Sequence, residues 1–199
     1  MKGKAEAAMG SDPSTTATSE FRGFRAAQLV RAGVLVVVGV VIAFTAPLHR
    51  ELGFDLWVLG GGLTLIGAAT LLEYFALRGT SESWWVAARA VVAFAAAGSL
   101  LAVSDSLAMA LVLALWAALT AVITIMRLTR GVQPMKVAVP SLLLSATLAV
   151  LVLLFRDDAV ALIGFFGAYA IIRGVFLGIA AFDPRPANDA VSSSTQGSE

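Results

Sequence analysis

The chain contains no cysteine and a single histidine among its 199 residues. Without thiols it cannot form disulfides, thiolate nucleophiles, iron–sulfur ligands or zinc-ribbon sites. A single imidazole also argues against a histidine-built metal site and against a catalytic triad. Charged residues make up only 14% of the chain, against about 25% in an ordinary soluble domain. The formal net charge of +1 gives no reason to expect a nucleic-acid partner.

Sequence signatures of catalysis and nucleotide binding are missing as well. The glycine run at 60–62 lies inside an apolar segment and is not followed by the Lys and Ser or Thr of a phosphate-binding loop. The chain has no HExxH or GxSxG motif, and only Glu73 is an acidic residue well inside an apolar segment. We therefore expect no enzymatic activity, and the sequence identifies no catalytic residue, cofactor, metal ion or small-molecule ligand.

Long apolar runs dominate what is present. Hydrophobic residues make up 59% of the chain and the mean hydropathy is +0.88. A helix that crosses the hydrocarbon core needs about 20 mostly apolar residues. Six segments meet this requirement: 26–46, 54–76, 84–103, 106–126, 137–155 and 159–182. The sequence therefore predicts an all-α membrane protein with a six-helix transmembrane domain over 26–182 and the lipid bilayer as its main partner.

The two ends of the chain have a different composition. Residues 1–25 and 183–199 are rich in small polar and charged residues and lack apolar periodicity. Such segments cannot bury enough apolar surface to fold, so we expect two disordered tails.

Basic residues are distributed unevenly between the two sides of the predicted domain. One side holds Arg22, Arg25, Arg31, Arg78, Arg89, Arg127, Arg130, Lys136 and Arg185, and the other holds Arg50 and Arg156. Lysine and arginine accumulate on the cytoplasmic side of membrane proteins. The prediction is a multi-pass protein of the cell inner (plasma) membrane with both termini in the cytoplasm.

The six segments are interpreted as three sequential helical hairpin repeats. Small residues seven positions apart mark the second helix of each hairpin: Gly60 and Gly67, Ala114 and Ala121, Gly167 and Gly174. In the first hairpin, Arg31, Gly39 and Pro47 follow one another at intervals of eight residues. Small residues permit close helix contact within a bilayer, so we expect these positions and Gly39 to be packing sites.

Two stretches of the chain carry a resemblance to a known family. The run FFGAYAIIRG occupies 165–174, and Trp84, Trp85 and Arg89 are followed by small residues at 97–98. These patterns resemble the helix signatures of the HdeD-like acid-resistance membrane proteins, a family of short repeats. The resemblance spans about 25–182 and implies a small inner-membrane protein tied to acid stress, without catalytic residues. The sequence departs from the family at Arg173, where an acidic residue is often found.

Three charged residues inside the apolar segments form a candidate polar site: Glu73, Arg89 and Arg173. Charges within a bilayer are costly, and each requires an explanation. Arg31 and Arg89 lie near cytoplasmic ends, where they can reach the headgroups as topology anchors. Glu73 lies at a similar depth to Arg89, and we expect an ion pair between these two residues.

Arg173 is the deepest of these charges. It lies nine residues from the end of the last segment, roughly 13 Å inside the membrane. An arginine at this depth costs about 2.5–3.5 kcal/mol unless it is compensated, so it should face the bundle interior. Hydroxyl partners on other helices are available at Thr64, Thr70, Ser99, Thr120, Thr124, Ser145 and Thr147.

The sequence leaves two functional interpretations open. The first is a non-enzymatic membrane protein of the HdeD-like type that supports acid or envelope stress tolerance, and that could act as a homo-oligomer. The second is a small channel or transporter in which Arg173 faces a polar central cavity. A passage for solute would require polar residues from several helices to converge at one depth.

Overall fold

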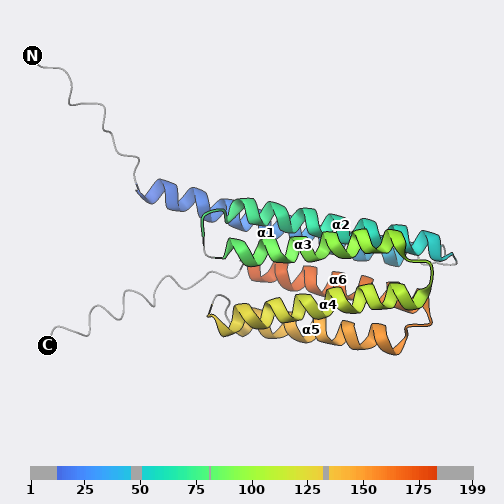
Figure 1. Cartoon of the computed structure of the whole chain (residues 1–199). Helices are drawn as coiled ribbons and strands as arrows, with labels where there is room; N and C mark the ends of the chain where they lie inside the picture. The colour runs from blue at the N-terminus through green and yellow to red at the C-terminus, as the bar shows by residue number, and fades with distance from the viewer. Residues whose placement is uncertain (1–12, 46–50, 81, 132–134, 183–199) are drawn as a thin grey trace, which may run out of the picture.

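A computed structural model describes residues 13–45, 51–80, 82–131 and 135–182 (Figure 1). Within these ranges the chain is entirely helical, with no strand, and this confirms the predicted all-α class. The elements are α1 (Pro13–Phe44), α2 (Leu52–Ala76), α3 (Ser83–Ser99) with the short 3₁₀ turn η2 (Leu100–Ala102), α4 (Ser106–Thr129), α5 (Met135–Leu154) and α6 (Ala159–Phe182).

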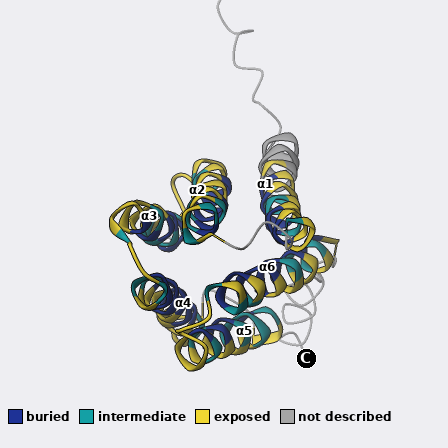
Figure 2. Cartoon of the chain, turned by 90° about the vertical axis from the view of Figure 1, so that its right-hand side faces the viewer, coloured by how far each residue is buried: buried dark blue, intermediate teal, exposed yellow. Residues whose placement is uncertain are grey.

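All six predicted membrane segments lie on these helices, each of which is long and apolar enough to cross a bilayer. Figure 2 shows exposed positions along the outer sides of the helices. Large apolar side chains occupy many of them, including Phe44, Leu101 and Phe182, which are each more than two-thirds exposed. An apolar outer surface of this extent is suited to contact with lipid rather than with water.

The first helix is longer than its membrane segment. It begins at Pro13, and proline is favoured at the first position of a helix because its missing N–H would be unpaired there. Residues 13–25, which we expected in the disordered tail, are therefore helical, and α1 extends past its neighbours at one end (Figure 1). The predicted tail positions 1–12 and 183–199, and also Pro47, lie outside the described residues.

Short turns connect the helices and set their antiparallel order. Gly79 after α2 and Gly131 after α4 have φ angles of +98° and +69°, which glycine adopts without steric cost. Asp105 and Asp158 precede α4 and α6, and their carboxylates accept hydrogen bonds from the backbone N–H of Ala108 and Ala161. These carboxylates satisfy N–H groups that would otherwise be unpaired at a helix start.

The helices follow their chain order around the bundle (Figure 2). The most extensive contacts join α1 to α6, α2 to α3 and α4 to α5. The two helices within each predicted hairpin also contact each other, but less extensively. Because the helices alternate in direction, the start of α1 and the end of α6 lie at the same end of the bundle (Figure 1).

The α1–α6 contact depends on glycine. A Cβ atom on Gly39 would lie 2.5 Å from Ile171 Cγ1 and 2.6 Å from the Gly167 carbonyl oxygen. On Gly174, a Cβ atom would lie 2.8 Å from the Ala32 carbonyl oxygen. Real Cβ atoms do not approach other atoms so closely, so the two backbones are in direct contact at three of the small-residue positions identified in the sequence.

The other predicted packing positions are in looser surroundings. Gly67 faces the Phe94 ring of α3, which a Cβ atom would meet at 3.1 Å. Ala114 and Ala121 are buried on α4. An added Cβ atom on Gly60 would meet no atom closer than 3.9 Å, so no close helix contact depends on this glycine. The seven-residue spacing therefore has different consequences in α2, α4 and α6.

Candidate functional site

Four charged side chains gather inside the bundle, each from a different helix. They are Arg31 on α1, Glu73 on α2, Arg89 on α3 and Arg173 on α6, and we refer to them as the central charged cluster. Arg31, Glu73 and Arg173 are 4%, 5% and 6% exposed, and Arg89 is half-buried. The cluster therefore contains the three predicted polar-site residues together with Arg31, which we expected to reach the membrane surface as an anchor.

Glu73 forms its ion pair with Arg31. The Arg31 Nη1 atom donates to Glu73 Oε2 across 2.7 Å, which joins α1 to α2. The expected pair between Glu73 and Arg89 is wrong. α2 packs against both α1 and α3, so both arginines lie on neighbouring helices, and the Glu73 carboxylate is directed to the arginine of α1.

Arg173 is held by hydroxyl groups and by an aromatic ring. Its Nη1 atom donates to Ser145 Oγ of α5 at 3.0 Å and to the Tyr169 hydroxyl on its own helix. The guanidinium carbon lies 5.4 Å from the centre of the Tyr169 ring, within the range of a cation–π contact. Ser145 was among the predicted partners, whereas Tyr169 was missed, although its i−4 spacing on one helix face is a signal that the sequence contains.

The remaining predicted hydroxyl partners form no hydrogen bond with Arg173. Most of them donate to the carbonyl four residues earlier on their own helix: Thr64 to Gly60, Thr70 to Ile66, Ser99 to Ala95 and Thr124 to Thr120. Thr147 is exposed. Such local bonds satisfy a hydroxyl without any partner helix, so a Ser or Thr within a span is weak support for a polar passage.

A small polar cavity lies beside the central charged cluster. Arg31, Arg89 and Arg173 line it, and Thr70, Thr120 and Tyr169 complete its polar wall. The apolar wall includes Trp116, whose ring packs edge-on against both Phe166 and Tyr169 with ring centres 5.6 Å apart. The cavity has a volume of about 10 Å³, which is close to the minimum that a single water molecule requires.

Three guanidinium groups in and near this site have unmet hydrogen-bonding capacity. Within the described residues, Arg89 has no hydrogen bond and no ion pair. The buried Nε atom of Arg31 also has no partner, although the same side chain binds Glu73. Arg127 on α4 lies outside the cavity lining. Its Nε atom is buried without a partner as well, although the side chain forms a 3.6 Å ion pair with Glu82.

The side chains of the cluster limit its chemistry. Guanidinium groups remain protonated at physiological pH and act only as hydrogen-bond donors. The one carboxylate, Glu73, is engaged with Arg31. The cluster therefore offers no activated nucleophile and no group that would exchange protons near neutral pH. Its chemistry is that of holding negative charge in place.

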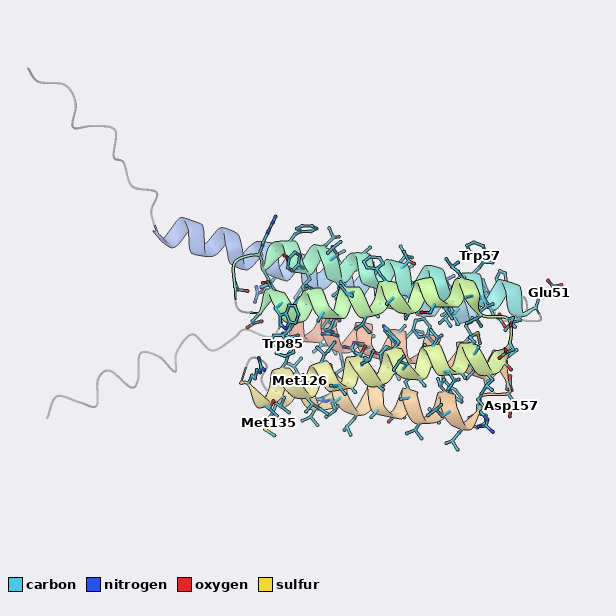
Figure 3. All side chains as sticks on the ribbon, in the orientation of Figure 1. Glu51, Trp57, Trp85, Met126, Met135 and Asp157 are labelled. Atoms are coloured by element: carbon cyan, nitrogen blue, oxygen red, sulfur yellow. The ribbon has the colours of Figure 1, made fainter. Side chains whose placement is uncertain are left out.

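A larger hollow lies away from the charged residues. A groove of about 610 Å³ runs between α2 and α3 and is lined mainly by Trp57, Phe94, Leu101 and glycines. Figure 3 shows Trp57 pointing outward near the end of the bundle that also holds Glu51 and Asp157. None of the lining residues is charged. The groove is large, but its lining offers no charged group that could bind a ligand. Its apolar wall is part of the lipid-facing surface.

Comparisons with known proteins returned no match: no family model, no curated protein and no solved structure is similar to the chain.

Removing the Tyr169 hydroxyl should destabilise the bundle measurably. Tyr169→Phe leaves the buried Arg173 with one hydroxyl partner fewer, and we expect the free energy of unfolding to fall by about 1–3 kcal/mol. The measurement is unfolding of the purified protein in detergent, followed by helical circular dichroism.

Tyr74→Phe is the matched control for this prediction, since Tyr74 is the other of the two tyrosines in the chain. Its ring contacts Phe75 edge-on, and its hydroxyl has no hydrogen bond to a described residue. We expect a change of less than about 0.5 kcal/mol. Equal effects of the two substitutions would show that the Tyr169 hydroxyl does not stabilise Arg173.

Proposed function

We propose that the chain is a non-enzymatic membrane protein of the HdeD-like type that supports tolerance to acid or envelope stress. The observation that carries this proposal is the small size of the cavity beside the central charged cluster. That cavity has a volume of only about 10 Å³, and its polar lining consists of arginines and hydroxyl groups. A bundle with so little polar space at this site is suited to a structural role within the membrane, and the HdeD-like patterns at 84–98 and 165–174 favour the stress role.

The proposed topology consists of three hairpin repeats in the cell inner (plasma) membrane, with both termini in the cytoplasm. Equivalent turn glycines support the repeat, since Arg78-Gly79 and Arg130-Gly131 close two successive repeats. The unequal distribution of Lys and Arg supports the orientation. Under this proposal the central charged cluster lies in the cytoplasmic half of the membrane.

A survival assay tests the stress role. A strain that lacks the chain should survive a shift to acid medium less well than its parent, and expression of the wild type should restore survival. A Gly60→Ala variant should restore survival equally, because no close contact is disturbed at that position. Unchanged survival of the deletion strain under both acid and envelope stress would contradict the proposal.

A second candidate function is a small channel or transporter with Arg173 at its cavity. The observation that favours it is that three arginines from α1, α3 and α6 line one cavity. Transport would require the bundle to open well beyond the single-water space. Ion flux into liposomes that is abolished by Arg173→Ala, with the variant still folded, would favour this function over the first.

A further inference from the structure

The central charged cluster has more positive than negative charge. Three guanidinium groups accompany a single carboxylate, Glu73, within the described residues. The other buried carboxylate, Asp55, lies near the opposite end of α2, about 27 Å away along the helix axis. Because a guanidinium cannot lose its proton at physiological pH, neutralisation by deprotonation is not available to the cluster.

The three arginines differ in how their charge is compensated. Glu73 neutralises Arg31, and hydroxyl groups and an aromatic ring surround Arg173. Arg89 lines the same cavity without a hydrogen bond or ion pair. The Arg31 Nε donor is also unpaired. Buried polar groups in proteins are normally hydrogen-bonded. The buried, unpartnered Arg31 Nε atom beside the uncompensated charge of Arg89 therefore indicates a ligand that accepts hydrogen bonds and has negative charge.

The size of the cavity selects among negative ligands. Its space accommodates about one water centre. A tetrahedral oxyanion such as sulfate or phosphate has four oxygen atoms and does not fit there without separation of the helices. A monatomic anion such as chloride is only slightly larger than a water molecule and accepts hydrogen bonds from several directions, so it fits with a small adjustment of the lining side chains.

We propose that the polar cavity binds one small monovalent anion of the size of chloride, coordinated by Arg31, Arg89 and Arg173. The Arg89 guanidinium supplies the uncompensated charge, and Arg173 and the Arg31 Nε atom supply further donors. This site rests on the six-helix membrane bundle of the proposed function but not on the stress role. Binding therefore does not require the protein to transport the ion.

Anion-dependent stability tests the site in the full-length protein. The chain is purified in mild detergent in gluconate buffer, and its unfolding midpoint is measured as chloride replaces gluconate at constant ionic strength. A ligand that binds only the folded state raises the midpoint with concentration. We expect a saturating rise with chloride and with bromide, and no such rise with sulfate.

Variants assign the effect to the cavity. Arg89→Gln should weaken chloride binding about tenfold or more, and its midpoint in gluconate should equal or exceed that of the wild type, because the uncompensated charge is gone. Arg156→Gln removes an exposed arginine at the other end of the bundle and should respond to chloride as the wild type does.

Several results would overturn the proposal. Equal stabilisation of the wild type by chloride and gluconate is one, and an unchanged chloride response of Arg89→Gln is another. Stabilisation by sulfate as strong as by chloride would indicate surface screening instead of a cavity site. If Arg89→Gln does not accumulate, binding of radiolabelled chloride to the wild type is measured instead. The bound chloride should be displaced by bromide and not by sulfate, and the absence of binding would overturn the site.

These outcomes are distinct from those of the survival assay. A protein that binds chloride without affecting acid survival would retain the anion site and lose the proposed stress role. A protein that restores survival but binds no chloride would lose the site alone.

Discussion

Replacing Glu73 with glutamine is expected to lower the free energy of unfolding by about 3–5 kcal/mol, because it leaves a buried arginine without its counter-charge. Glu73 and Arg31 are 5% and 4% exposed and are joined by a 2.7 Å contact, so solvent screens the pair little. Folded domains are commonly stable by only about 5–15 kcal/mol. Glu73→Gln should therefore unfold at a much lower fraction of denaturing detergent in mixed micelles.

The double variant Arg31→Gln, Glu73→Gln should recover most of this loss, since removing both charges leaves no buried ion unpaired. Glu73→Gln combined with Arg89→Gln should recover less, because Arg31 then remains unpaired. If the combination with Arg89→Gln restored stability better, Arg89 would be the true partner of Glu73. A Glu73→Gln protein as stable as the wild type would contradict the buried ion pair altogether.

Alanine at Gly39 or at Gly174 is expected to destabilise the bundle by about 3 kcal/mol each, at the upper end of overpacking effects. The obstacle at both positions is partly backbone: the Gly167 carbonyl oxygen for Gly39 and the Ala32 carbonyl oxygen for Gly174. A flexible side chain can move aside, but backbone atoms can make room only if α1 and α6 separate. The same detergent-unfolding measurement reports the loss.

Gly60→Ala is the matched control on another helix. Its added methyl group meets nothing closer than 3.9 Å, and alanine favours helix over glycine by about 0.5–1 kcal/mol. The stability of this variant should therefore stay unchanged or rise slightly. If Gly39→Ala behaved like Gly60→Ala, the close α1–α6 contact would not exist in the protein.

Hydropathy was sufficient to predict the six membrane helices, because the cost of exposing polar backbone to lipid leaves few alternatives for such apolar runs. It could not predict the extension of α1 to Pro13. Residues 13–25 are polar enough to resemble a tail, and their helix continues outward from an apolar segment that begins at Arg25.

The partner of a charged residue is harder to predict from the sequence than the depth of that residue in the membrane. Counting residues from the helix ends places Arg31, Glu73 and Arg89 near one level, but it contains no information on the direction in which each side chain points. α2 contacts both α1 and α3, so Arg31 and Arg89 are both on helices beside Glu73, and depth does not distinguish between them. The Tyr169 contact to Arg173 has a different origin, since a hydroxyl four residues earlier on the same helix reaches the guanidinium without any partner helix.

The spacing of small residues predicts close helix contacts at some positions and not at others, because it does not show which way a helix face points. A pair of glycines seven residues apart lies on one side of a helix, yet the pattern does not say what that side faces. On α6, the pair at 167 and 174 meets the backbone of α1, whereas Gly60 on α2 borders the open groove.

The seam between α1 and α6 joins two helices that are far apart in the sequence. Arg31 and Glu73 can meet once α1 and α2 are inserted, but the wall that α6 contributes to the cavity is added only after α6 has been synthesised. Until then Gly39 lacks the helix against which its backbone packs. A nascent chain that stalls before α6 therefore displays an open flank on α1, where transiently exposed surface favours misassembly.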